Sequence, residues 1–269
     1  TLADAVARRP AAPLIHAADA LQTAINFILG MPGLLHGAAA GPTQLEYALE
    51  RKPTLAIIAL GYAEVLEAAT SASAESIPDA ATFRANYARI VGSLRETGCE
   101  VIVTTIPDPM DTAHFSTCAA AARVVKLTPG ALERDYGLAN GDRVTIDGLT
   151  EIGYQLMGGR AEPLPAGSIL RGAVAAEISS RVRSLDEAVT SVATEYGASV
   201  YDLGGLFRRI RKQGIAAGSR TLTADFLGGF YSLNGYYPGK TGQALIANEL
   251  LELINRTYET AFEPIDISA

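Results

Sequence analysis

The sequence predicts an α/β fold with a mainly parallel sheet. Three short apolar runs rich in β-branched residues are separated by longer segments with helical periodicity: residues 54–60 (TLAIIAL), 101–106 (VIVTTI) and 199–203 (SVYDL). Strands that alternate with helices are typical of βα units, in which the strands run parallel. We therefore expect the three strands to be parallel and adjacent in one sheet.

Length and composition predict one globular domain. The chain has 269 residues, of which 48% are hydrophobic and 19% are charged, which is enough for one sizeable core, so we place a single domain over residues 1–269. The net charge of −7 comes without a cluster of Lys or Arg, which argues against a nucleic-acid partner. No apolar run reaches the roughly 18 residues that a membrane span needs, so we expect none.

Each expected strand follows a helical segment. Residues 54–60 are almost all apolar, as in a strand buried on both faces, and they follow a helix that ends near Arg51-Lys52-Pro53. Residues 101–106 follow a helix over about 83–95, which Gly98 terminates. The third strand follows a helix over about 174–196. These boundaries predict that a helix precedes the strand in each of the three units.

A segment between the second and third strands breaks this alternation. The turn signals Asn140-Gly141-Asp142 and Asp147-Gly148 flank residues 143–146. We expect an excursion from the main sheet that carries a short β-ribbon.

The C-terminal stretch 229–254 joins a polar loop to an amphipathic helix. Asn234-Gly235 and Pro238-Gly239 are turn signals, and Thr241 is the expected N-cap of the helix. Apolar residues then recur at helical spacing: Leu245, Ile246, Leu250, Leu251 and Ile254. The sequence thus places a loop at the mouth of a helix.

The run SLNGYYP (residues 232–238) resembles the last block of the SGNH/GDSL hydrolases, a family of esterases and lipases. In that family a Ser-Leu-Asp-Gly-x-His-Pro run precedes a Gly-x-x-x-Ile-Ala-Asn helix and supplies the catalytic Asp and His. The resemblance places Asn234 at the Asp position and Tyr237 at the His position. Both catalytic side chains are therefore replaced.

The run LGYAEVL (residues 60–66) resembles the family's Gly-x-Asn-Asp turn, whose Asn donates to the oxyanion of the tetrahedral intermediate. Gly61 keeps the tight turn, Ala63 takes the Asn position and Glu64 takes the Asp position. Ala63 has no side-chain donor, so the resemblance supports the family's fold and argues against its chemistry.

The likeness runs from Thr1 to about Arg256 and implies a three-layer α/β/α sandwich with flavodoxin-like strand order. Residues 1–10 (TLADAVARRP) resemble the segment just after the family's second block. The resemblance therefore places the first strand, with its Gly-Asp-Ser nucleophile turn, upstream of residue 1.

Two functions fit this pattern. A serine hydrolase needs a nucleophile, a base, a group that orients the base, and oxyanion donors. With Ala63, Asn234 and Tyr237 in three of these positions, we expect a catalytically degenerate protein with a binding, structural or assembling role outside the cell or in its envelope. The alternative is an active ester hydrolase whose nucleophile lies on an N-terminal segment and whose base is recruited from elsewhere.

The missing first strand would leave a gap beside residues 54–60. We expect that gap to be filled by a strand from an N-terminal fragment or from a neighbouring subunit through self-association. Residues 143–147 or 258–269 are the alternatives within this chain.

Other side chains have both a functional and a structural interpretation. Tyr231 and Tyr236 are candidate ligand contacts, although tyrosines in such loops more often pack and bond through the hydroxyl. The three histidines, His16, His36 and His114, are expected to lie far from the family's base position.

The two cysteines, Cys99 and Cys118, lack the spacing of metal ligands. A disulfide and two buried thiols both fit. We expect no metal and no other cofactor.

Overall fold

The computed structural model describes residues 43–267. Its centre is a parallel sheet of order β1-β2-β6, formed by β1 (Leu55–Ile58), β2 (Glu100–Thr104) and β6 (Ser199–Tyr201). The middle strand β2 pairs in parallel with both neighbours. The prediction of three parallel, adjacent strands is confirmed.

The strands end earlier than the apolar runs that predict them. After β1 the chain turns at Gly61, which has φ 100° and is the N-cap of α5 (Tyr62–Thr70). After β2, the Thr105 N–H still donates to the Tyr201 carbonyl at 3.0 Å, but no ladder continues. The last apolar residues of the first two runs therefore belong to the loops at the carboxyl edge of the sheet, and Leu203 at the end of the third run begins a helix.

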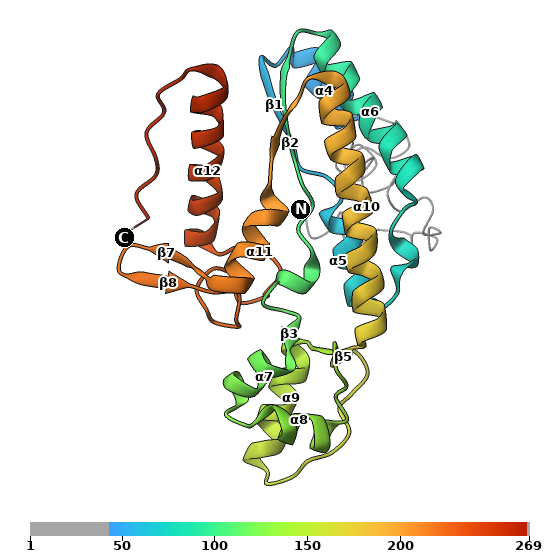
Figure 1. Ribbon diagram of the computed structural model, residues 1–269, viewed down its shortest axis with the longest axis vertical. Helices are drawn as coiled ribbons and strands as arrows, with labels where there is room; N and C mark the ends of the chain where they lie inside the picture. Colours follow the sequence, from blue (N-terminus) through green and yellow to red (C-terminus); the bar gives the residue numbers. More distant parts are fainter. Residues whose placement is uncertain (1–42, 268–269) are drawn as a thin grey trace, which may run out of the picture.

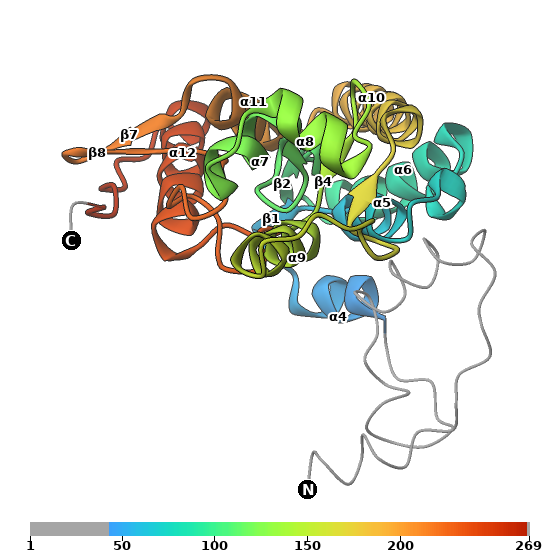
Figure 2. The ribbon, with the colours of Figure 1, turned by 90° about the horizontal axis from the view of Figure 1, so that it is seen from below.

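Helices lie on both sides of the sheet (Figures 1 and 2). On one side, α6 (Ala80–Glu96) packs along α10 (Gly172–Tyr196); on the other side is α12 (Lys240–Tyr258). α6 begins where the Asp79 carboxylate accepts the N–H groups of Ala81 and Thr82, which is a typical N-cap.

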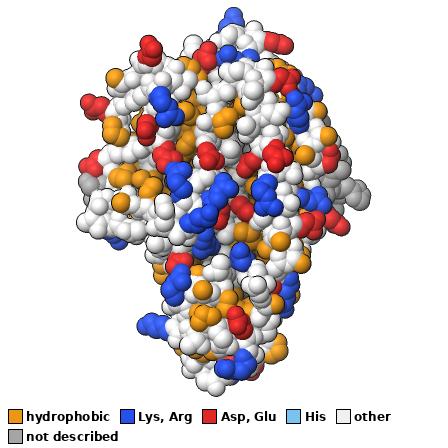
Figure 3. All heavy atoms as spheres, in the orientation of Figure 1, with side chains coloured by type: hydrophobic (Ala, Val, Ile, Leu, Met, Phe, Trp, Pro, Cys, Tyr) orange, Lys and Arg blue, Asp and Glu red, His pale blue; other side chains and the backbone are white. Residues whose placement is uncertain are grey.

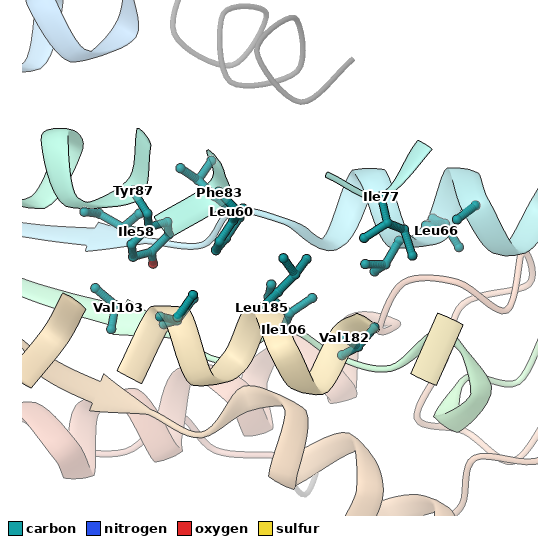
Figure 4. Packing of buried hydrophobic residues seen from close by; sticks show 14 of the residues in the cluster. Ile58, Leu60, Leu66, Ile77, Phe83, Tyr87, Val103, Ile106, Val182 and Leu185 are labelled. Atoms are coloured by element: carbon teal, nitrogen blue, oxygen red, sulfur yellow. The ribbon is translucent and has the colours of Figure 1, made fainter. Parts of the chain in front are cut away.

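The main core lies between the sheet and the α6/α10 side (Figure 4). α10 contributes a row of buried residues at helical spacing, from Ile178 through Val182 and Leu185 to Val189. The largest side chains in this core, Phe83 and Tyr87, come from α6. Both expected helices are therefore present, each a few residues longer than the sequence indicates.

The excursion after β2 is a small lobe (Figure 1). It holds three helices, α7 (Cys118–Val125), α8 (Pro129–Tyr136) and α9 (Ile146–Met157), and three short strands, β3 (Ser116–Thr117), β4 (Arg143–Val144) and β5 (Ile169–Leu170). The strands form an antiparallel sheet of order β3-β4-β5. The expected β-ribbon is thus part of a lobe that is mostly helical.

The boundary within this excursion differs from the prediction that residues 143–146 are extended. Ile146 is the first residue of α9, because the Thr145 hydroxyl accepts the Gly148 N–H at 3.1 Å and caps the helix. Thr–x–x–Gly at this point is a helix start rather than the end of a ribbon strand.

The C-terminal part begins with α11 (Leu203–Gln213), which Asp202 caps by accepting the Gly205 N–H at 2.9 Å. A hairpin of β7 (Ile215–Ala217) and β8 (Arg220–Leu222) follows. The remaining short elements are α4 (Gln44–Arg51) before β1, and the 3₁₀ turns η1 (Ala74–Ser76) and η2 (Pro109–Asp111).

α12 begins at Lys240 with Gly239 as its N-cap, so the expectation of Thr241 as the cap is wrong. The Gly239 N–H donates to the Phe230 carbonyl at 2.8 Å, and this tertiary bond fixes where the helix starts. Of the apolar stripe on this helix only Leu245 is buried; Ile246, Leu250, Leu251 and Ile254 are half-buried.

The outer edge of β1 has no partner strand within residues 43–267. Ile57 on this strand is 48% exposed. Neither internal segment expected to fill this place does so: Arg143 and Val144 pair inside the small lobe, and the tail after α12 lies along that helix, where Asn248 and Asn255 bond it. The N-terminal residues 1–42 lie outside the described part.

Candidate functional site

The turn after β1 is held by close packing at Gly61. A Cβ built at Gly61 would lie 2.5 Å from Ile106 Cδ1, and φ is +100°. An L side chain rarely adopts this backbone conformation. Glycine is therefore required here by the fold alone.

Tyr62 joins this turn to the loop before α12. Its hydroxyl donates to the Tyr236 carbonyl at 2.7 Å, and its ring meets the Tyr237 ring edge-on at 5.8 Å between centroids. The structure therefore brings together the two segments on which the family resemblance rests.

Ala63 and Glu64 are neighbours in the first turn of α5 and differ in exposure. Ala63 is exposed and offers only a methyl group. The Glu64 side chain is buried, and its Oε2 has no hydrogen-bond partner within the described residues. Burial raises the pKa of Glu64 to about 7, and the charge of Glu67 adds to the shift. Glu64 is thus a buried acid with an unpartnered carboxyl oxygen in the described part of the chain.

Asn234 organises its own loop. Its Oδ1 accepts the N–H groups of Tyr236 and Tyr237 at 3.0 and 3.3 Å and the Ser232 hydroxyl at 2.8 Å. This is the arrangement of an Asx turn, in which the side chain closes a turn of the backbone. Within residues 43–267, Asn234 Oδ1 bonds no histidine.

Tyr237 is 47% exposed and has its ring against Tyr62. Its backbone carbonyl accepts both the N–H and the hydroxyl of Ser232, at 2.9 and 3.0 Å. The side chain at this position is thus a phenol packed on an aromatic ring, not an imidazole.

The other two tyrosines of the loop pack against the body of the protein. Tyr231 is buried, its hydroxyl donates to the Asp111 carbonyl at 3.1 Å, and burial raises its pKa well above the usual value. The Tyr236 hydroxyl is 3.0 Å from His114 Nε2. In the structure both hydroxyls are engaged with protein groups.

His114 is the site neighbour that the sequence does not indicate. Its ring stacks on Tyr236 with 4.1 Å between centroids, and its backbone N–H donates to the Gly235 carbonyl at 3.1 Å. The resemblance puts the family's base at Tyr237, and His114 stacks on the residue next to it, so the expectation that His114 lies far from that position is wrong. His16 and His36 lie outside the described residues.

The environment of His114 favours its neutral form. Burial lowers its pKa, and the Asn234 backbone and the charge of Asp147 oppose this shift. A cavity of about 220 Å³ lies beside the ring, with Thr145, Asp147 and Tyr236 in its wall. Among the described residues, the one side-chain hydrogen bond of the His114 ring is to the Tyr236 phenol. No serine, threonine or cysteine side chain of this part of the chain bonds to the ring.

Among residues 43–267, no cluster of three or more His, Cys, Asp or Glu is placed to hold a metal ion. Cys99 is buried and Cys118 half-buried, and both are free thiols. In the same part of the chain, no helix combines the length and apolar character needed to cross a membrane.

Comparison of the chain with profiles of protein families, with curated proteins and with solved structures finds no match in any of the three.

Proposed function

We propose that this chain is an SGNH-hydrolase-like domain that has lost ester hydrolysis and serves as a binding or structural domain. The observation that carries the proposal is the state of the loop 229–239. Asn234 Oδ1 is used to close the turn, and the Tyr237 ring packs on Tyr62. Neither group is arranged to relay a proton, although both occupy the positions where the family has its orienting acid and its base.

The fold assignment within this proposal is a three-layer α/β/α sandwich of SGNH type. It is supported by the parallel sheet, by α6 and α10 on one side of that sheet and by α12 on the other. It is also supported by the contact of the turn at Gly61 with the loop before α12, because parallel sheets place functional loops at their carboxyl edge.

The expected loss of rate is large. Removal of one oxyanion donor typically costs about 10²–10³ in rate, and loss of the acting triad costs on the order of 10⁶. Ala63 supplies no donor and Tyr237 no base. A serine restored upstream would therefore still lack two of its partners.

One observation favours an active hydrolase as the second candidate. His114 lies against Tyr236, close to where the family's base acts. Two features weigh against it: the Nε2 atom is already bonded to the Tyr236 hydroxyl, and burial lowers the pKa of His114. To accept a proton at Nε2 the ring would first have to break that bond, and Nδ1 is buried without a hydrogen-bond partner among the described residues.

The assembling role in this proposal rests on the free edge of β1. Its outer backbone groups have no strand partner within residues 43–267, and Ile57 is half exposed. An unpaired strand edge can be completed by an added strand. We propose that an N-terminal segment or a second copy of this chain supplies that strand.

Hydrolysis of p-nitrophenyl acetate and butyrate tests the loss of catalysis. The natural full-length protein is expected to release p-nitrophenol no faster than the same protein after heat denaturation, because no base is positioned at Tyr237. The matched variant is His114→Ala. A rate well above the denatured control that His114→Ala abolishes would reject the proposal in favour of the second candidate.

A further inference from the structure

We propose that a cavity at the carboxyl ends of β2 and β6 binds a small organic molecule through a phosphate or sulfate group. The cavity has a volume of about 330 Å³, which lies at the lower end of the range for small-molecule sites. The inference is independent of whether the protein catalyses ester hydrolysis.

The position of the cavity is one at which α/β proteins bind ligands. Ile106 lines it just after β2, and Gly204 lines it just after β6. Ligands of open parallel sheets bind outside the carboxyl ends of the strands. Neither the turn at residues 61–64 nor the loop 229–239 lines this cavity, so it is distinct from the candidate site above.

The cavity is basic although the chain is acidic. Five basic side chains line it: Arg143, Arg183, Arg208, Arg211 and Lys212. Three acidic side chains line it: Asp108, Asp111 and Asp186. With all of them ionised the net charge is +2, in a chain whose net charge is −7. Figure 3 shows Lys and Arg side chains gathered at the centre of this face, level with α11 and the lower part of α10.

Three of these cations are free to meet a ligand. Within residues 43–267, Arg183, Arg208 and Lys212 form no ion pair or hydrogen bond through their side chains. All three are exposed at the rim. Arg208 and Lys212 are four residues apart on α11, which places them on the same face of that helix.

Arg211 forms a fixed and largely buried part of the wall. Its side chain is 14% exposed, and its Nη2 donates to the carbonyls of Thr112 and Phe115. Its Nε–H, like that of Arg143, is buried without an acceptor in the described part of the chain. Guanidinium groups match the oxygens of phosphate and sulfate in geometry and charge.

The remaining wall is apolar. Ile106, Met110 and Val182 line the cavity between the charged groups. A bare inorganic ion would leave this surface without a contact. The combination of a cationic rim and an apolar wall fits an ester with a small organic body, and its oxyanion would be held by Arg183 and Arg208.

Asp111 gives the cavity a pH dependence. Burial raises its pKa to about 6. The charge of Asp108 raises it further, whereas Arg211, Arg208 and Arg143 lower it.

Asp186 on α10 behaves in the same way. Burial raises its pKa to about 6, while its Oδ1 accepts the Ile106 N–H at 2.6 Å. Asp202 and Asp108 raise the pKa through their charges and Arg208 lowers it. As the pH falls from 8 to 5, protonation of Asp111 and Asp186 raises the net charge of the lining from +2 to +4. A sulfate monoester keeps its single negative charge over this interval, so its binding should strengthen.

Calorimetric titration of the intact protein with phenyl sulfate, phenyl phosphate and inorganic sulfate at low ionic strength tests this site. Phenyl sulfate is expected to bind about tenfold more tightly at pH 5 than at pH 8 because two nearby negative charges are removed. It is also expected to bind more tightly than inorganic sulfate, and comparison with phenyl phosphate tells which ester the cavity prefers.

The double variant Arg183→Gln/Arg208→Gln is expected to bind phenyl sulfate at least about tenfold more weakly, because each charge-assisted contact is among the stronger hydrogen bonds. The control is Arg89→Gln, which removes an exposed charge from α6, outside the cavity; its affinity should stay within about twofold. Both arginines of the double variant are exposed, and circular dichroism checks that it is folded.

Three results would overturn the proposal. The first is that the protein binds neither phenyl ester, the second is that it binds inorganic sulfate as tightly as phenyl sulfate, and the third is that the folded double variant keeps the affinity of the wild type.

Discussion

Replacement of Gly61 by alanine is expected to lower the free energy of unfolding by about 3 kcal/mol, the sum of backbone strain and overpacking. The residue has φ +100°, and the added methyl would lie 2.5 Å from Cδ1 of the buried Ile106. Ile106 cannot retreat freely, since it belongs to the main core. Urea unfolding of the wild type and the variant measures the difference.

Gly153→Ala is the matched control. Gly153 lies inside α9, and a Cβ there meets no atom within 4 Å. Alanine is the better helix former by about 0.8–1.0 kcal/mol, so this variant should gain stability. A Gly61→Ala variant as stable as the wild type would show that the turn after β1 is not as tightly packed as described here.

Glu64→Gln is expected to stabilise the protein by about 3–4 kcal/mol at pH 8 and to have little effect near pH 4, since one pKa unit corresponds to about 1.4 kcal/mol. The pKa of Glu64 is raised to about 7 by burial, whereas an unfolded Glu titrates near about 4.3. Between these two values the folded state holds a proton that the unfolded state releases. The stability of the wild type therefore falls as the pH rises through this window, and glutamine, which cannot ionise, avoids that loss.

The experiment compares urea unfolding of the two proteins from pH 4 to pH 8. Asp111 and Asp186 also have raised pKa values, so the difference between the two curves, rather than the slope of either, isolates Glu64. Glu50→Gln, an exposed change on α4 whose charge does not contribute to the pKa of Glu64, should leave the curve parallel to that of the wild type. If Glu64→Gln also gave a parallel curve, the acid would not be desolvated.

The sheet could be predicted from the sequence because short runs of neighbouring residues indicate each strand. Residues 54–60 and 101–106 are apolar and β-branched, and each follows a helical segment, so their type and parallel direction follow directly. The ends of the strands could not be predicted from the sequence. The chain leaves the sheet after β1 because it turns at Gly61 and enters α5. The first helical residue of α12 was likewise fixed by the bond from Gly239 to Phe230, which is a tertiary contact.

The site neighbours were less predictable than the strands. His114 and Tyr236 are 122 residues apart in the chain, and no motif links them. The same holds for the basic cavity, whose Arg143, Arg183 and Arg208 come from the small lobe, α10 and α11. By contrast, the two segments that carry the SGNH/GDSL resemblance, the turn at Tyr62 and the loop before α12, are in direct contact.

Incubation of the natural full-length protein with a fluorophosphonate, followed by intact-mass measurement, tests the proposed loss of catalysis most directly. The probe bonds covalently to a serine only when a base activates that serine, and an active serine hydrolase in a parallel sample confirms that the reagent works. The proposal puts Ala63, Asn234 and Tyr237 in place of the donor, the orienting acid and the base, so the expected mass is that of the unmodified chain. Addition of one equivalent of probe to a single serine would contradict the proposal.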